Sequence, residues 1–320
     1  MGIRVMKSGL QSTIQDLGRY CYQQYGMPVS GAMDTLALRL GNIILTNAED
    51  EAAIECTLIG PSLFFEENQL ICITGANLFP KLNDNAIQMW KPIFVQKGDI
   101  LSFENSSSNG SRSYICFYGG LNIPVILGSK STYQKANIGG WKGRALKIDD
   151  RITFLKPYNG IIRHFNWSLD TSVNPIISTP LIRVVEGPQL KQFEEMSVVN
   201  FFDKMFSISN QSDRMGFRLE SEPILLKEKK EILSSAVTFG TIQVPAHGQL
   251  IILMADHGTT GGYPVIAVVA SIDLPLLAQK KFNDKIQFEW ISLKNAQKLM
   301  KEQNAQLNKL KIAIRWKYES

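Results

Sequence analysis

The stretch MADHGTTGGYPVIAVVAS, residues 254–271, places residues that can do chemistry between two apolar runs. A carboxylate can move or position a proton, and hydroxyl groups can donate hydrogen bonds to a developing negative charge. On these grounds the candidate catalytic residues are Asp256, Thr259, Thr260 and Tyr263. Gly261 and Gly262 let the backbone approach a substrate closely, and their amides can complete an oxyanion cradle.

An ordinary turn is the alternative interpretation of this stretch. Gly-Gly supplies positive φ angles, and Pro264 ends hydrogen-bonded structure. In that case Asp256 caps the turn, and the threonine hydroxyls satisfy backbone groups. The sequence leaves both interpretations open.

Two further groups of polar residues are candidates for substrate binding. Arg214 and Arg218, in SDRMGFRL, suit anion recognition through the bidentate guanidinium fork, although surface ion pairs would use them equally well. The first half of the chain holds a polar cluster made of Ser129, Ser131, Thr132 and Arg144. We expect this cluster to line a cleft between two domains, where small-molecule sites commonly form. Asp34 and Arg39 are explained equally well as a helix cap and a surface charge.

Several familiar sites are excluded by spacing. GSKST at 128–132 does not fit the G-x-x-x-x-G-K-[ST] phosphate loop, because Ser129 separates Gly128 from Lys130. The three histidines, at positions 164, 247 and 257, show no metal-ligand spacing, so we expect no metal site. The chain also lacks the G-x-S-x-G nucleophile elbow.

The composition is that of an ordinary soluble globular protein with a sizeable core. Of 320 residues, 44% are hydrophobic and 20% are charged. The longest apolar runs, LIILMA and PVIAVVA, are far shorter than the roughly 20 residues of a membrane-spanning helix, and the N-terminus has no apolar leader. We therefore expect a cytoplasmic protein with no membrane partner. The four widely spaced cysteines favour reduced core thiols over disulfides or zinc; they are Cys21, Cys56, Cys72 and Cys116.

The net charge of +5 comes from the C-terminal segment. Residues 292–320 contain seven basic and two acidic residues, so the rest of the chain is neutral. A basic segment without an aromatic stacking pattern is typical of a solvated helix face. We expect no nucleic-acid partner.

The elements that must position these residues are mostly strands. Apolar runs of four to eight residues recur along the chain between Gly, Pro, Asn and Asp, which predicts a mainly β protein organised as a barrel or sandwich. Helical periodicity is clearest at 33–46 and 292–307. After the second helix, LKIAIRWKY at 310–318 alternates apolar and charged residues, which predicts a strand with one wet face.

A weak internal repeat predicts two domains. SGAMDTLALRL at 30–40 and SDRMGFRL at 212–219 each have a serine that opens a Met-containing turn ending in Arg-Leu. Each precedes an Asp-x-apolar-x-Phe-Glu strand, at 99–104 and 284–289. The near-equal spacing favours two copies of one β fold. The predicted division is an N-terminal domain of 1–165, a linker of 166–180 and a C-terminal domain of 181–320 that ends in a basic helix-strand tail.

Seven segments of the chain, in order, carry a resemblance. They are GLQSTIQDLGR (9–19), GMPVSGAMDTLALRLGN (26–42), AIECTLIGPSLFF (53–65), GSKSTY with GGWKGRALKIDD (128–150), VVEGPQ (184–189), SDRMGFRL (212–219) and GTIQVPAHGQLIILMADHGTTGGYP (240–264). These segments resemble the biotin-dependent carboxyltransferase family, in the branch that holds the C subunit of bacterial 5-oxoprolinase, allophanate hydrolase subunit 2 and the Kip-inhibitor antagonist.

The resemblance implies a fold, an activity and partners. It implies two cyclophilin-like β-barrel domains with a few short helices and a C-terminal helix. It also implies action only in a complex with the A subunit of the enzyme and its Kip-inhibitor-like B subunit, with ATP as co-substrate. That complex would cleave the small molecule 5-oxo-L-proline to L-glutamate by phosphorylating the lactam carbonyl oxygen and then admitting water. The hydroxyl, amide and arginine donors named above would bind the phosphate and the oxyanion.

The chain departs from the family pattern at three places. The usual Asp-Arg-Gln-Thr-Thr-Gly-Gly-Tyr-Pro has His257 and Gly258 in place of the basic residue and the amide. Asp149 stands where Gly commonly precedes Asp150, and Ser221 stands where Gly commonly follows Glu. The first departure removes side chains that could contact phosphate or carboxylate, so the resemblance supports the fold more strongly than the activity.

Two other functions are compatible with the same resemblance. One is a urea- or allophanate-type carboxyltransferase that takes carboxybiotin from another protein. No biotin is expected on this chain, because Met6-Lys7 and Met300-Lys301 lack the second Met of a Met-Lys-Met hairpin. The other is a non-catalytic regulator that binds a kinase-inhibitor protein related to the B subunit.

Overall fold

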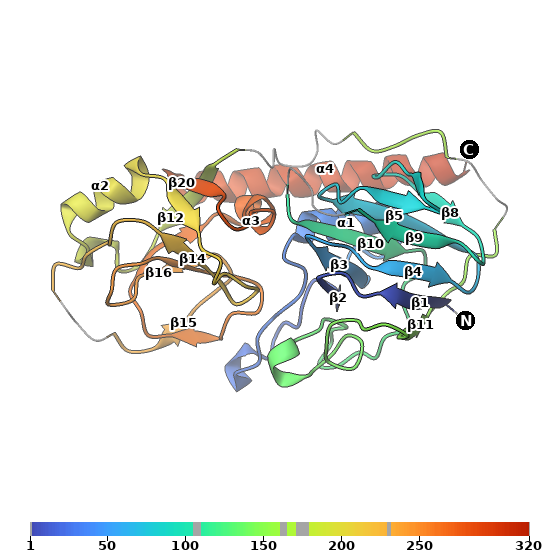
Figure 1. Cartoon of the computed structure of the whole chain (residues 1–320). Helices are drawn as coiled ribbons and strands as arrows, with labels where there is room; N and C mark the ends of the chain where they lie inside the picture. The colour runs from blue at the N-terminus through green and yellow to red at the C-terminus, as the bar shows by residue number, and fades with distance from the viewer. Residues whose placement is uncertain (1, 105–109, 161–164, 171–178, 229–231, 320) are drawn as a thin grey trace. The chain divides into compact units, whose positions relative to one another are not determined.

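The computed structural model describes residues 2–104, 110–160, 165–170, 179–228 and 232–319, and Figure 1 shows the whole chain. The chain divides into two units: unit 1 is Met1–Arg19, Ser30–Pro175 and Ala305–Ser320, and unit 2 is Tyr20–Val29 and Ile176–Asn304. Residues 171–178 of the predicted linker lie outside the described residues. The predicted domain boundaries therefore stay predictions.

Unit 1 contains two β-sheets. The six-stranded sheet has the order β11-β1-β4-β9-β6-β7, from β1 (Gly2–Lys7), β4 (Ser62–Phe65), β6 (Pro80–Leu82), β7 (Asn85–Ala86), β9 (Ile100–Phe103) and β11 (Arg151–Thr153). The five-stranded sheet has the order β2-β3-β10-β5-β8, from β2 (Gln11–Gln15), β3 (Ala53–Thr57), β5 (Gln69–Gly75), β8 (Ile93–Val95) and β10 (Arg112–Phe117). Both sheets contribute to one hydrophobic core, in which Val5 and Phe65 of the first meet Ile73 and Phe117 of the second.

Helix α1 (Thr35–Ile44) packs on β5 and β10 of the five-stranded sheet. It begins at Asp34, whose carboxylate accepts a hydrogen bond of 2.9 Å from the Ala37 amide and so satisfies one of the unpaired donors of the first turn. Gly41 lets the helix approach closely, because a Cβ there would come within 2.6 Å of the Cys116 sulfur. The predicted helix is confirmed, and Asp34 serves as its cap.

Unit 2 contains a closed barrel, which confirms the mainly β prediction for this part of the chain. Its order is β12-β19-β16-β17-β14-β13-β20, from β12 (Leu181–Glu186), β13 (Phe206–Ile208), β14 (Gly216–Glu220), β16 (Thr241–Gln243), β17 (Ile251–Leu253), β19 (Val265–Val269) and β20 (Lys285–Trp290). A two-stranded ribbon joins β15 (Ser235–Ala236) to β18 (Thr260–Gly261). This unit also contains α2 (Glu195–Asp203), α3 (Leu274–Ala278) and the first residues of α4 (Leu293–Glu319). The ring of Phe201 in α2 stacks on Phe288 in β20, with 4.5 Å between ring centroids.

The prediction of a strand at 310–318 is wrong. These residues continue helix α4, which runs without a break over Leu293–Glu319. The alternating pattern misled because Leu310, Ile314 and Tyr318 also repeat at the helical spacing and pack against unit 1. The intervening Ile312 and Trp316 are exposed, as the outer face of a helix requires and the inner face of a strand does not allow.

The internal repeat does not hold at the segments that suggested it. Thr35–Ile44 is a helix, whereas Gly216–Glu220 is the barrel strand β14. The later segments do correspond, since an aspartate precedes each of the strands β9 and β20 and accepts a hydrogen bond from the amide three residues earlier. These short sequence matches therefore reflect a shared turn and do not by themselves indicate a repeated domain.

The remaining short elements are 3-10 helices at Gln23–Tyr25, Gln134–Ala136, Leu190–Gln192 and Ser271–Asp273. Of the four unbridged cysteines, Cys56, Cys72 and Cys116 are buried and Cys21 is exposed. Burial raises the pKa of each buried thiol, so these side chains behave as small apolar groups. Among the described residues, no helix has the length and apolarity needed to cross a membrane.

Candidate functional site

The predicted catalytic stretch lies between two strands of the unit 2 barrel. It leaves β17 after Leu253 and enters β19 at Val265. Its first residues, Asp256 and His257, are buried, whereas Thr260 is exposed and Tyr263 is half exposed. The stretch therefore has a buried base and an exposed tip.

Arg214 and Asp256 form the buried base. The guanidinium donates from Nε to Oδ2 at 2.9 Å and from Nη2 to Oδ1 at 3.0 Å, and the Asp256 amide donates to the Arg214 carbonyl at 2.8 Å. Both side chains are more than nine-tenths buried. The Arg214 guanidinium, which the sequence suggested for binding an anion, thus binds a carboxylate of the chain itself. A bidentate pair fixes both position and orientation, so it anchors the start of the loop.

His257 adds a second buried contact beside this pair. Its Nδ1 lies 2.5 Å from the Gly258 carbonyl oxygen, and its amide donates to the Met254 carbonyl at 3.0 Å. Burial lowers the pKa of the imidazole, so the neutral form is favoured near pH 7. Where the family pattern has a permanently charged residue, this chain holds a neutral ring bonded to its own backbone.

The two glycines of the tip serve close approach and not a left-handed turn. Neither Gly261 nor Gly262 has a positive φ, contrary to what the turn interpretation expects. A Cβ on Gly261 would come within 2.3 Å of the Gln243 amide nitrogen, and one on Gly262 would come within 3.2 Å of the Ser234 hydroxyl. Pairing of β18 with β15 also engages the backbone of Thr260 and Gly261. Beside that backbone, the tip presents the side-chain hydroxyls of Thr260 and Tyr263.

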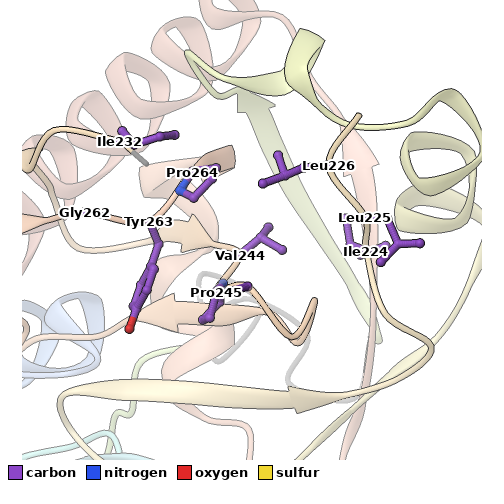
Figure 2. A pocket seen from close by; sticks show the side chains of 10 residues that line it. Ile224, Leu225, Leu226, Ile232, Val244, Pro245, Gly262, Tyr263 and Pro264 are labelled. Atoms are coloured by element: carbon purple, nitrogen blue, oxygen red, sulfur yellow. The ribbon is translucent and has the colours of Figure 1, made fainter. Parts of the chain in front are cut away.

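An apolar pocket of about 470 Å³ borders the tip in unit 2. Figure 2 shows that aliphatic side chains and two prolines form most of its lining. The residues are Ile224, Leu225, Leu226, Ile232, Val244, Pro245, Ala246, Gly262, Tyr263 and Pro264. None of them is charged, so this pocket by itself suits an apolar group better than a carboxylate.

Arg218 does not join Arg214. In β14 the side chains of Phe217 and Leu219 are buried in the barrel, and Arg218 between them is exposed. Arg214 is buried and paired with Asp256, so the two guanidinium groups lie in different environments. The predicted substrate-binding role of Arg218 stays a prediction.

The hydroxyls of the first-half cluster are buried around Asp16 in unit 1. Ser129 donates to Asp16 Oδ1 at 2.8 Å, Ser131 donates to the same oxygen, and Ser131 accepts from the Asp16 amide at 3.0 Å. Arg19, fully buried, donates from Nη2 to the Ser131 carbonyl at 2.7 Å. Thr132 donates to the Ile14 carbonyl at 2.9 Å. These groups hold the 129–132 segment against the 14–19 segment.

Arg144 lies outside that network and pairs with Asp150. Two hydrogen bonds of 2.7 Å join the guanidinium to the carboxylate, and the Lys147 amide donates to it at 2.7 Å. Although burial alone would raise the pKa of Asp150, these donors lower it to about 2. Asp149, at the family's usual glycine, has a φ of +66°, a conformation that glycine adopts without steric cost.

The sequence interpretation missed Asp16 and Arg19, which organise the first cluster, and Gln243, which packs on the tip. These residues lie in the segments GLQSTIQDLGR and GTIQVPAHG, but the side chains that they contact are distant in sequence. Asp16 and Ser129, for example, are 113 positions apart. Asp34 and Arg39 follow the simpler interpretation, since Asp34 caps α1 and Arg39 pairs with Glu49. The expected cleft between two domains stays a prediction.

Known proteins resemble the chain over nearly its full length. The C subunit of Haemophilus influenzae 5-oxoprolinase is 38% identical over 95% of this chain and 96% of its own length. The protein of the same name from Escherichia coli is 33% identical over 96% of this chain and 97% of its own. The crystal structure of Kluyveromyces lactis urea amidolyase matches 97% of this chain and 20% of that chain, with a TM-score of 0.90 and 29% identity.

The model of the family described as carboxyltransferase domain, subdomain A and B, matches residues 25–290. That range includes the Arg214–Asp256 pair, the exposed tip and the first-half cluster. The agreement between this match and the full-length relatives leads to one conclusion: the chain belongs to the carboxyltransferase domain family, subdomain A and B.

Proposed function

We propose that the chain is the C subunit of an ATP-dependent 5-oxoprolinase, which opens 5-oxo-L-proline to L-glutamate together with its A and B subunits. The observation that carries this proposal is the reciprocal coverage of the relatives. The two 5-oxoprolinase C subunits match over 96% and 97% of their own lengths, whereas the urea amidolyase matches over 20% of its chain. This chain therefore matches the two 5-oxoprolinase C subunits over nearly their whole length and the urea amidolyase over one segment.

The exposed hydroxyls of the tip are suited to the charge that develops in this reaction. Transfer of the ATP γ-phosphoryl group to the lactam carbonyl oxygen releases ADP and activates the carbonyl carbon. Water then adds to that carbon, the ring C–N bond breaks to leave an acyl phosphate, and a second water releases phosphate and glutamate. Each addition of water builds negative charge on the oxygens of a tetrahedral intermediate. Thr259, Thr260 and Tyr263 supply donors without a charged competitor in the adjacent pocket lining. Donors held in place before the reaction stabilise such charge most effectively.

Arg214 and Asp256 act in this proposal as positioning residues. Both carboxylate oxygens of Asp256 accept hydrogen bonds from Arg214, so the carboxylate is held in one orientation. Its role is to fix the first residues of the loop, so that the hydroxyls of Thr259, Thr260 and Tyr263 are held in one orientation. The interpretation of Asp256 as an acid or base stays a prediction beside this positioning role.

The finer architecture and the partners belong to the same proposal. The barrel of unit 2 and the two sheets of unit 1 are both taken as cyclophilin-like domains. ATP is the co-substrate of the complex, and no biotin is attached to this chain. The small-molecule site is completed by a homologue of the B subunit, because the tip of this chain offers donors and no charged group for the substrate carboxylate.

A second candidate is a carboxyltransferase acting on a urea-like substrate. The TM-score of 0.90 with the urea amidolyase structure favours it. In that case another protein supplies carboxybiotin, and the hydroxyls of the tip stabilise the enolate-like or urea oxyanion.

A reconstitution distinguishes the two candidates. The purified chain is mixed with the A and B subunits from the same organism, and glutamate release from 5-oxoproline is followed with and without ATP. We expect ATP-dependent release from the mixture and none from the chain alone. Carboxyl transfer from carboxybiotin to urea, without glutamate release, would establish the second candidate. Robust turnover by the isolated chain would contradict a shared site.

A further inference from the structure

The apolar pocket of unit 2 has the tip of the candidate loop as one of its walls. Gly262, Tyr263 and Pro264 belong to its lining, and in Figure 2 Leu225 lies on the side away from them. This lining still has aliphatic surface to offer, since Leu225 is 47% exposed. An apolar group that enters the pocket therefore covers exposed aliphatic surface beside the residues that carry the hydroxyl donors.

Main-chain hydrogen bonds hold both walls of the pocket. The Val244 amide donates to the Pro264 carbonyl at 2.9 Å, which fixes the tip wall against the end of β16. On the other wall, the Leu225 carbonyl accepts from the Glu194 amide at 3.0 Å. Because these bonds are made within the chain, the pocket exists before a ligand binds, as is usual for small-molecule sites.

The pocket is larger than the substrate of the proposed reaction needs. Its volume of about 470 Å³ falls in the range of about 300–1,000 Å³ that holds drug-sized ligands. 5-Oxoproline is a single small ring, and its apolar part consists of the ring methylenes alone. None of the lining residues is charged, so the pocket does not compensate the burial of the substrate carboxylate. An apolar substituent on the ring is the group that fits it.

We propose that this pocket makes the complex accept 5-oxoprolines that carry an apolar substituent on ring carbon 4. The inference rests on the proposed function and names its substrate class. Carbon 4 is bonded to the carbonyl carbon that reacts, so a carbonyl oxygen held at the hydroxyls of Thr260 and Tyr263 brings this substituent to the pocket. The bonds that form and break are those of the parent reaction. ATP phosphorylates the carbonyl oxygen, water opens the ring at the C–N bond, and the product is a 4-substituted glutamate.

The probe for this inference is 4-benzyl-5-oxo-L-proline. The complex is reconstituted with the A and B subunits and ATP, and formation of 4-benzylglutamate is compared with glutamate formation from 5-oxoproline. We expect kcat/KM for the benzylated lactam to be at least as high as for 5-oxoproline, because burial of the benzyl group adds favourable apolar contact.

A charge on the pocket wall tests whether the benzyl group lies there. Leu225→Glu makes burial of an apolar group beside it unfavourable, and it should lower kcat/KM for the benzylated lactam at least about tenfold more than for 5-oxoproline. Leu181→Glu is the matched control, because Leu181 is 42% exposed and lies outside the pocket lining. It should change kcat/KM for both lactams by the same factor.

Three results would count against the inference. A complex that opens 5-oxoproline and not the benzylated lactam overturns it and leaves the proposed function in place, as does an equal effect of Leu225→Glu on the two lactams. A complex that releases no glutamate from 5-oxoproline in the presence of ATP removes the proposed function and this inference with it.

Discussion

The two polar clusters of the molecule use the same residue types for different ends. In unit 1 the hydroxyls of Ser129, Ser131 and Thr132 are buried and bonded to the protein itself. In unit 2 the bonded groups are the pair at the base of the loop, and the hydroxyls of Thr260 and Tyr263 face outward. The difference shows that a candidate binding site is recognised by the hydrogen-bond donors that stay exposed, and not by donors that bond to other groups of the protein.

Removing the base of the unit 2 loop should have the largest effect. Arg214→Met leaves the Asp256 carboxylate buried without its partner, and breaking a buried pair on one side typically costs about 3–5 kcal/mol of unfolding free energy. Urea unfolding followed by circular dichroism measures this loss. Arg218→Met is the control, because that side chain is exposed four positions away and should change stability by less than about 0.5 kcal/mol. Equal effects of the two would mean that the pair does not anchor the loop.

Removing a hydroxyl from the exposed tip should affect activity and not stability. Thr260→Val keeps a similar volume, and an exposed hydroxyl contributes about 1 kcal/mol or less to stability. Loss of one donor from a preorganised site lowers the rate about a hundredfold. The measurement is glutamate release by the reconstituted complex beside a thermal melt. Full activity of a folded, partner-bound variant would contradict a binding role for the tip. Residues 254–264 would then be an ordinary turn, and the two clusters would not differ in function.

The sequence predicts some secondary-structure elements correctly and one wrongly. The recurring apolar runs predicted buried strands, and two of them, LICITG and SYICFYGG, form β5 and β10. Their shortness and their β-branched and aromatic residues favoured strands over helices. The segment 310–318 failed because its apolar residues satisfy a period of two and, in part, a period of 3.6. Only packing against unit 1 selects the helix, and packing is not visible in a single sequence.

The site was predictable in its residue types and not in their pairing. Arg214 and Asp256 were both singled out, yet for separate roles, because nothing in a sequence states that two residues 42 positions apart will share two hydrogen bonds. Ser129 and Ser131 looked like donors for a ligand because their acceptor, Asp16, lies in a different segment. Burial decides between a structural and a functional hydroxyl, and burial is a property of the fold.

Removing a hydroxyl from the unit 1 cluster should have the opposite signature. Ser131→Ala deletes a donor to Asp16 and an acceptor for its amide, both buried, which costs about 1–3 kcal/mol of unfolding free energy. Activity per folded molecule should stay near that of the parent. Ser221→Ala, at a half-buried serine whose hydroxyl donates to the Glu222 carbonyl of the next residue, is the stability control. Lost activity with unchanged stability would give this cluster a direct role and make the two regions alike.

The Arg144–Asp150 pair of unit 1 can be compared directly with the Arg214–Asp256 pair of unit 2. It makes the same bidentate contact, but its arginine is less buried. The pKa of Asp150 is lowered to about 2 in the folded chain, against about 3.9 when unfolded. A group whose pKa is lowered by folding stabilises the protein above its unfolded pKa, and the contribution is lost as pH falls through the folded pKa. Its size is about 2 kcal/mol at pH 7, and about half is gone by pH 3.

Urea unfolding of the parent and Asp150→Asn at pH 7, 5, 4 and 3 measures this contribution. The free-energy difference between them should be constant from pH 7 to 5 and shrink below pH 4, because protonation then removes from the parent what the substitution removes at every pH. Arg144→Met deletes the other side of the same bonds and should follow the same curve. A difference that stays constant down to pH 3 would show that the pair is a geometric contact with no electrostatic share in stability, unlike the buried base of the unit 2 loop.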